Sequence, residues 1–124
     1  RSDLFLVVVD RETGKIAGFL NGLATDREHL TDDFFADANL HDPEGVNIML
    51  LGLDVLPEYQ HQGLARKLME QYKERERARG RKKLILTCLP DKVEMYKKFG
   101  FKDHGIGDSV WGGEAWHEMD SILN

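Results

Sequence analysis

Residues 53–65 constrain the fold of this chain more than any other segment, because a strand pattern changes there into a helix pattern across a polar loop. Residues 46–55 are almost continuously apolar and Pro57 follows them, which is typical of a strand buried on both faces. In residues 63–79, apolar side chains recur at helical spacing on one face: Leu64, Leu68, Met69 and Tyr72. The segment therefore predicts a buried strand, a short loop and a helix.

A strand–loop–helix unit of this kind can bind phosphate groups. The first amides of a helix have no partner within the helix and lie at the positive end of its dipole. Gly63 allows a phosphate to approach the backbone closely, and Arg66 and Lys67 add positive charge beside it. Any strand–loop–helix connection also needs a glycine and polar residues, so the spacing alone favours a purely structural interpretation.

Strand and helix patterns alternate along the rest of the chain. Two short apolar runs, at residues 4–9 and 16–20, flank turn-forming residues and predict a β-hairpin, and residues 31–33 can cap a short helix. The remaining elements are expected at residues 83–88 (strand), 90–99 (helix) and 115–123 (strand). This order predicts one α/β domain over residues 1–124, with a mixed, largely antiparallel sheet flanked by helices.

Composition narrows the classes of function. A single cysteine, Cys88, excludes an internal disulfide and favours a cytoplasmic location, and the five histidines show no metal-ligand spacing, so no metal is expected. The formal net charge of −5 argues against nucleic acid as a partner and suits a cationic substrate. Residues 73–83 are basic but interleaved with glutamates, which predicts a solvated helix face. The apolar runs are too short to span a membrane.

Two motifs resemble one enzyme family. The pattern Gln60-x-x-Gly63-x-Ala65, after the strand, resembles the Gln/Arg-x-x-Gly-x-Gly/Ala signature of the Gcn5-related N-acetyltransferases (GNAT family). Some thirty residues later, Tyr96 begins a segment through residue 101 that resembles the family's Tyr-x-x-x-Gly-Phe element. Both motifs occur in order, separated by a helix, a strand and a second helix.

The resemblance is greatest to the arylalkylamine (serotonin-type) branch of that family. Residues 40–45 are similar to the branch's Leu-His-x-Pro-x-Gly, residues 86–88 to its Leu-x-Cys, and residues 28–31 to its Glu-x-Leu-Thr. The likeness covers the chain from about residue 7 onward. The family's first strand and two helices would lie before Arg1, so this resemblance implies a domain that is incomplete at its N-terminus.

The resemblance implies an acetyl-CoA-dependent N-acetyltransferase that acts on a small primary amine by direct transfer. The strands at residues 46–55 and 83–88 would splay apart, and a backbone N–H near Val55 would stabilise the oxyanion. Tyr96 would act as general acid toward the departing thiolate, unless it only packs on the sheet. The residues implied in coenzyme binding are Leu53, Asp54, Val55, Gln60, His61, Gln62, Gly63, Leu64, Ala65 and Arg66. Arg81 to Lys83 could lie near the adenosine phosphate, and a homodimer through the last strands is expected.

The sequence names no general base. The positions that carry two histidines in the vertebrate arylalkylamine enzymes are Met49 and Leu51 here, and His41, Asp54 or a water chain are the alternatives. A non-catalytic acyl-CoA sensor, an acetyltransferase of peptide amines, a polyamine acetyltransferase and a nucleic-acid-binding fragment remain open. Cys88 is expected to be a buried structural residue rather than a nucleophile. The two tryptophans, Trp111 and Trp116, either pack in the core, or Trp111 lines an acceptor slot.

Overall fold

The computed structural model describes residues 5–123, apart from the side chains of Ala38 and Trp111. In this part of the chain a six-stranded sheet has the order β1-β2-β3-β4-β6-β5, and only the β3–β4 pair is parallel. The strands are β1 (Phe5–Val9), β2 (Ile16–Thr25), β3 (Asn47–Val55), β4 (Lys83–Cys88), β5 (Lys102–Ile106) and β6 (His117–Ile122). The mixed, largely antiparallel sheet predicted from the sequence is confirmed.

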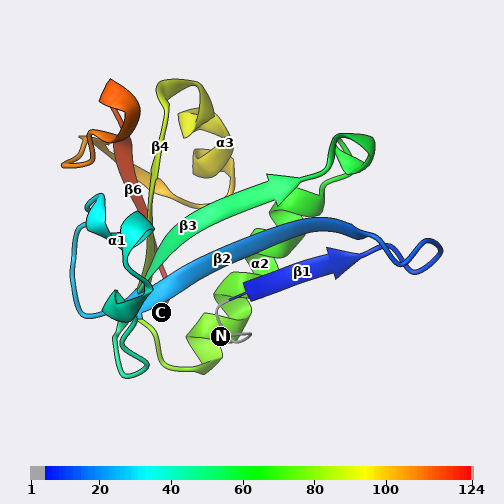
Figure 1. The fold of residues 1–124 in the computed structure, drawn as a ribbon, viewed down its shortest axis with the longest axis horizontal. Coiled ribbons are helices and arrows are strands. Elements are labelled where there is room, and N and C mark those ends of the chain that lie inside the picture. The colour runs from blue at the N-terminus through cyan, green and yellow to red at the C-terminus, as the bar shows by residue number, and fades with distance from the viewer. Residues whose placement is uncertain (1–4, 124) are drawn as a thin grey trace.

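Helices cover both faces of this sheet (Figure 1). The helix α2 (Leu64–Ala78) packs on β1–β3, and α3 (Val93–Lys98) lies on the same face, where Leu20, Ile48 and Met69 form the main core. The short α1 (Asp33–Ala36) covers the other face through a second cluster around Phe34 and Met49. Single turns of 3₁₀-helix lie at Ala38–Leu40 (η2), Pro57–Tyr59 (η3), Pro90–Lys92 (η4) and Trp111–Gly113 (η5).

The strand β2 is longer than its sequence predicts. The apolar run ends at Leu20, yet β2 continues to Thr25 because its second half pairs with β3, from Gly22 opposite Leu50 to Thr25 opposite Asn47. The burial predicted for β3 is correct only for its first half, where residues 47–50 are buried, whereas residues 51–55 are half-buried or exposed. Both differences arise from pairing between distant segments.

Two smaller predictions are wrong. Asp32 does not cap α1: it has helical backbone angles and makes no cap hydrogen bond, because its carboxylate accepts hydrogen bonds from the Ser109 hydroxyl and the Val110 N–H instead. The basic segment is not a solvated face throughout, since Glu76 in α2 is only 1% exposed and lies among three arginines.

The arginines around Glu76 fix the C-terminal end of α2. Arg75, Arg79 and Arg81 lie 3.0, 3.0 and 3.2 Å from its carboxylate oxygens, and Arg81 also donates to the carbonyl of Pro43 at 3.0 Å. Because a 15-residue helix is about 22 Å long, Arg81, just beyond the C-terminal end of α2, lies far from residues 60–65 at its N-terminal end.

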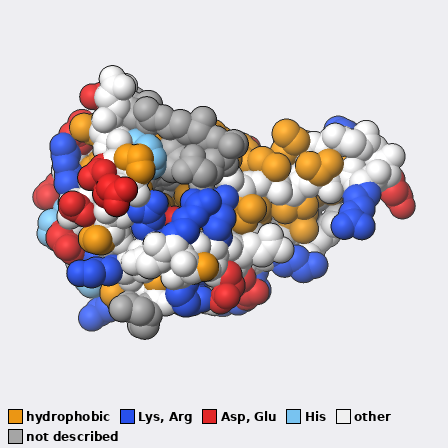
Figure 2. All heavy atoms as spheres, turned by 90° about the horizontal axis from the view of Figure 1, so that it is seen from below, with side chains coloured by type: hydrophobic (Ala, Val, Ile, Leu, Met, Phe, Trp, Pro, Cys, Tyr) orange, Lys and Arg blue, Asp and Glu red, His pale blue; other side chains and the backbone are white. Residues whose placement is uncertain are grey.

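The β1–β2 hairpin, with β3 and α2 packed against it, forms the narrower end of the molecule (Figure 1). Its exposed hydrophobic side chains include Phe5, Val7, Val9 and Ile16, between 45% and 53% exposed. Figure 2 shows hydrophobic side chains gathered along this narrower end with a few charged ones among them, and charged side chains of both signs over the wider end. No helix within residues 5–123 is long and apolar enough to cross a membrane.

Candidate active site

The sheet splits between its two parallel strands. The strands β3 and β4 pair only from Asn47 opposite Lys83 to Met49 opposite Ile85, after which they diverge (Figure 1). Leu51 is an extra residue in β3, because Asn21 pairs with Gly52 while the next residue, Gly22, pairs with Leu50. A bulge of this kind bends a strand and increases its twist. Beyond Met49, β3 therefore has no ladder partner on the β4 side.

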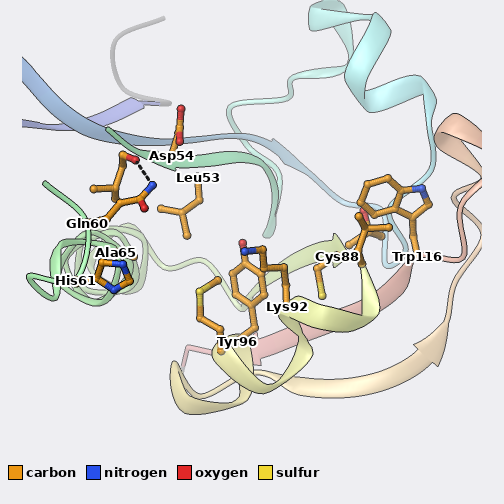
Figure 3. A pocket seen from close by; sticks show the side chains of 13 residues that line it. Leu53, Asp54, Gln60, His61, Ala65, Cys88, Lys92, Tyr96 and Trp116 are labelled. Carbon is orange, nitrogen blue, oxygen red and sulfur yellow. Dashed lines mark hydrogen bonds between the residues drawn. The ribbon is translucent and has the colours of Figure 1, made fainter. Parts of the chain in front are cut away.

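A cavity of about 490 Å³ occupies this split on the face that carries α2 and α3. Figure 3 shows its lining in a row, from Gln60, His61 and Ala65 at one end, past Leu53 and Tyr96, to Cys88 and Trp116 at the other. The remaining lining residues are Asp54, Val55, Thr87, Leu89, Lys92 and Met95. We call this cavity the trough.

The trough brings together most of the residues that the sequence implies in coenzyme binding and catalysis. Seven of them line it: Leu53, Asp54, Val55, Gln60, His61, Ala65 and Tyr96. Gly63, Leu64 and Arg66 line an adjoining hollow of about 220 Å³ that shares Val55, Gln60, His61 and Ala65 with the trough. Gln62 lines neither; it is exposed, and its side-chain amide lies 3.5 Å from the Glu58 carbonyl.

The loop before α2 leaves backbone amides free. Gly63 precedes the helix with φ 76° and ψ 13°, and the first backbone hydrogen bond there runs from the Lys67 N–H to the Gly63 carbonyl at 3.1 Å. Within the described residues, no hydrogen bond is donated by the amides of residues 61–66. Because a Cβ at Gly63 would meet nothing within 4 Å, glycine is needed here for its left-handed backbone rather than for lack of space. Free amides at a helix start can bind an anion, and we call residues 61–66 the candidate anion site.

Side chains hold this loop and the helix start in place. The Gln60 amide donates to the Val55 carbonyl at 3.0 Å, the dashed line in Figure 3. The Arg66 guanidinium lies over the Phe99 ring, 5.3 Å from its centroid, and donates to the Lys98 carbonyl at 3.3 Å. Arg66 thus joins the start of α2 to the end of α3 and places a positive charge beside the candidate anion site.

Tyr96 stands on α3 at the middle of the trough. Its side chain rises toward Leu53 in Figure 3, and its ring meets Phe99 and Phe101 edge-on at centroid distances of 6.0 and 5.8 Å. Burial, with a smaller effect of Cys88, raises the pKa of Tyr96 to about 12. The hydroxyl therefore stays protonated at neutral pH. Within residues 5–123 it donates no hydrogen bond to the protein, so it is available to a ligand.

Cys88 lines the trough as a neutral thiol. Burial, with smaller effects of Asp103 and Asp91, raises its pKa to about 11, and its sulfur lies 3.6 Å from that of Met119. Because the thiolate is the nucleophilic form, this environment opposes formation of an acyl-enzyme on Cys88.

A second cavity of about 320 Å³ opens on the opposite face of the split. It is lined by Phe35, Leu50, Leu51, Thr87, Ser109 and Trp116, and it shares Thr87 and Trp116 with the trough. We call it the far-side cavity. Of these residues, only Leu51 was considered for the site from the sequence, since no local pattern links segments so far apart in the chain; the sequence did not identify Phe35, Leu50, Thr87, Ser109 and Trp116.

The alternatives for a general base lie in different places. Met49 is fully buried in the cluster with Phe34, and Leu51 lines the far-side cavity. The Nδ1 atom of His41 accepts the Ala24 N–H at 3.1 Å, and His41 lines neither cavity, whereas Asp54 lines the trough and is exposed. The side chain of Trp111 lies outside the described residues. No cluster of three or more metal-binding side chains occurs in the part of the chain described.

Comparison with known structures confirms the fold. Nourseothricin acetyltransferase matches with 20% identity over 97% of this chain and 65% of its own, at a TM-score of 0.68. A GNAT-like decarboxylase in complex with isobutyryl-CoA is 19% identical over 97% of this chain and 78% of its own, at a TM-score of 0.74. A mutant spermidine N-acetyltransferase from Vibrio cholerae is 16% identical over 96% of this chain and 64% of its own, at a TM-score of 0.67. At these identities the likeness shows the fold alone. The chain spans 65% of the length of the first of these proteins.

The family follows from the sequence. A family model described as an acetyltransferase (GNAT) domain matches residues 1–103, so the chain belongs to the GNAT family. This confirms the family resemblance seen in the two motifs, while the arylalkylamine branch stays a prediction. A comparison with curated protein sequences finds no significant match.

Proposed function

We propose that this chain is an acetyl-CoA-dependent N-acetyltransferase that transfers the acetyl group directly to a primary amine. One observation carries the proposal: the trough runs from free helix amides to a protonated tyrosine and meets a second cavity at the split in the sheet. A coenzyme in the trough and an amine in the far-side cavity could therefore meet without a covalent enzyme intermediate. The raised pKa of Cys88 agrees with direct transfer.

In the proposed complex the pyrophosphate binds the free amides of residues 61–66, with Arg66 beside it. The coenzyme residues are those predicted from the sequence: Leu53, Asp54, Val55, Gln60, His61, Gln62, Gly63, Leu64, Ala65 and Arg66. The pantetheine arm lies along the unpaired edge of β3, whose backbone groups beyond Met49 lack partners on the β4 side. That edge directs the thioester toward Tyr96.

The reaction forms a C–N bond and breaks the C–S bond of the thioester. The amine nitrogen attacks the carbonyl carbon, and a backbone N–H near Val55 stabilises the oxyanion. The coenzyme sulfur leaves with the electron pair, and the Tyr96 hydroxyl donates its proton toward it. Because an ordinary thiol has a pKa of about 8.5, far below that of Tyr96, the hydroxyl contributes chiefly a hydrogen bond that strengthens as the sulfur becomes negative. The amine loses its proton to Asp54 or to water.

The acceptor we propose is a small amine with an apolar, arylalkylamine-like body. Four of the six residues that line the far-side cavity are apolar: Phe35, Leu50, Leu51 and Trp116. The cavity volume of about 320 Å³ suits a small molecule with a single aromatic ring system, and the negative net charge of the chain attracts cations. A polyamine would leave its second charge against this apolar lining.

A second candidate is a non-catalytic acyl-CoA sensor, which is favoured by one observation: Met49 and Leu51 cannot accept a proton. Release of coenzyme A thiol from acetyl-CoA, measured with arylalkylamines, polyamines and N-terminal peptides, separates the candidates. We expect release with arylalkylamines and little with polyamines. Release only with peptides would reassign the acceptor, and coenzyme binding without release by any amine would favour the sensor.

A further inference from the structure

The phosphate-binding loop that we propose contains a strained residue. His61 has φ 64°, and two residues later Gly63 has φ 76°. A left-handed backbone costs an ordinary L-residue about 1–2 kcal/mol, and such conformations persist only where the surroundings fix them. The loop therefore needs contacts that hold it in the shape that presents its amides.

Those contacts come from the β1–β2 hairpin, whose tip (residues 10–15) lies at the same end of the molecule as the loop after β3 (Figure 1). The Tyr59 hydroxyl donates to Oδ2 of Asp10 at 2.7 Å, and Nζ of Lys15 lies 2.6 Å from Oε2 of Glu58. The Leu56 N–H also donates to the Ala17 carbonyl at 2.8 Å. Three separate contacts thus join the hairpin to residues 56–59, directly before the loop.

Asp10 is itself held in position by its own turn. Its backbone N–H donates to the Lys15 carbonyl at 2.8 Å and its carbonyl accepts the Gly14 N–H at 2.8 Å. Its Oδ1 atom accepts the Glu12 N–H at 2.9 Å, which leaves Oδ2 pointing to Tyr59. Tyr59 in turn lines the hollow that contains His61 and Gly63. A rigid carboxylate therefore fixes the residue from which the loop departs.

We propose that Asp10, acting through Tyr59, is a positioning residue for coenzyme binding, and that the hairpin tip holds the loop of residues 60–63 in its phosphate-binding shape. This inference rests on the proposed coenzyme site. It assigns Asp10 no contact with the coenzyme, because the carboxylate acts only on the loop.

Because Asp10 is charged, positioning and electrostatic repulsion predict opposite changes in acetyl-CoA affinity when the charge is removed. A carboxylate near a phosphate site repels the phosphate, so removal of its charge would tighten coenzyme binding if electrostatics alone mattered. A positioning role for Asp10 predicts weaker coenzyme binding instead. In Asp10→Asn the dissociation constant of acetyl-CoA should rise about five-fold, the loss expected for one hydrogen bond of about 1 kcal/mol.

The experiment measures acetyl-CoA affinity by calorimetry for the wild type, Asp10→Asn, Tyr59→Phe, their double variant and Glu12→Gln. Glu12→Gln is the matched control, because it removes the same charge from the same turn and its exposed side chain makes no hydrogen bond or ion pair within residues 5–123. We expect similar losses for Asp10→Asn and Tyr59→Phe, no further loss in the double variant, and equal or tighter binding for Glu12→Gln. The KM for acetyl-CoA should rise while kcat and the KM for the amine stay unchanged.

Equal or tighter binding by Asp10→Asn, or additive losses in the double variant, would overturn the positioning role. A wild type that does not bind acetyl-CoA would instead refute the proposed function, so the two failures are distinguishable. Because Asp10 is on an exposed turn, we expect the folded variants to keep the wild-type thermal midpoint, and Tyr59→Phe tests the same link without altering that turn.

Discussion

Replacing Tyr96 by phenylalanine tests the proposed chemistry at a single atom. The substitution keeps the ring and its edge contacts with Phe99 and Phe101, and it removes a hydroxyl that has no hydrogen-bond partner within residues 5–123. The free energy of unfolding should therefore change by less than about 0.5 kcal/mol. Acetyl-CoA affinity should also stay within two-fold, since the trough keeps its shape.

The loss should occur in the chemical step. A positioned general acid contributes about 10²–10⁴-fold, and we expect the lower part of that range, about 100-fold in kcat, because a hydroxyl with a pKa near 12 donates a hydrogen bond more readily than a full proton. This equals about 2.7 kcal/mol of transition-state stabilisation. Initial rates of thiol release at saturating acetyl-CoA and amine give kcat for the wild type and the variant.

The pH profile of the wild type provides a further check on the same group. The acid must be protonated to act, and its raised pKa keeps it protonated below about pH 12. Tyr96 should therefore produce no loss of kcat between pH 7 and pH 10. A kcat for Tyr96→Phe within three-fold of the wild type would refute the assigned role. A tyrosine titration near pH 10 in the wild type, absent from the variant, would refute the argument from burial.

Four further substitutions have defined outcomes. Glu76→Ala should lower the free energy of unfolding by about 3–5 kcal/mol, because three arginines lose a buried partner. Its control, Glu74→Ala at an exposed position, should lower that free energy by less than about 0.5 kcal/mol. Equal effects of the two substitutions in chemical denaturation would contradict the buried cluster. Cys88→Ala should keep kcat within a few-fold, and loss of turnover together with a trapped acyl-protein in mass spectrometry of the wild type would contradict direct transfer. Trp116→Ala should raise the KM for apolar amines more than for acetyl-CoA, and an unchanged amine KM would remove it from the acceptor site. Gly63→Ala should weaken acetyl-CoA binding and cost about 1 kcal/mol of stability from its left-handed backbone, so unchanged values would contradict the loop geometry.

The sequence predicts those parts of the fold that local periodicity controls. Leu64, Leu68, Met69 and Tyr72 recur at helical spacing, and the last three are buried as that spacing requires. The turn chemistry around Gly14 and the apolar run of β3 similarly identify the hairpin and the central strand. Each of these signals lies within a few residues, so no knowledge of distant contacts is needed.

The site itself depends on contacts that local patterns do not contain. The split in the sheet coincides with the bulge at Leu51, which is defined only by the register between β2 and β3. The far-side cavity combines Phe35, Thr87 and Ser109 from three distant segments. Asp32 looks like a helix cap in the sequence, yet it binds Ser109, because tertiary packing places a hydroxyl and an N–H within reach of its carboxylate.

Similarity to family motifs located part of the candidate site, which hydrophobic periodicity alone could not do. The pattern at Gln60, Gly63 and Ala65 identified the loop whose amides are free in the structure, and the family-model match confirms the family to which that pattern points. It could not identify the contribution of Asp10, since the hairpin tip is brought to the loop only by the pairing of β2 with β3.

Mass spectrometry of a reaction containing the wild-type chain, acetyl-CoA and an arylalkylamine, with free thiol counted in the same sample, tests whether this chain transfers acetyl groups directly to the amine. Direct transfer predicts an amine heavier by one acetyl group, one thiol released for each amine modified, and no acetylated protein on the reaction path. Bound acetyl-CoA with neither product would contradict it, and acetylated protein that forms before the acetylated amine would contradict direct transfer.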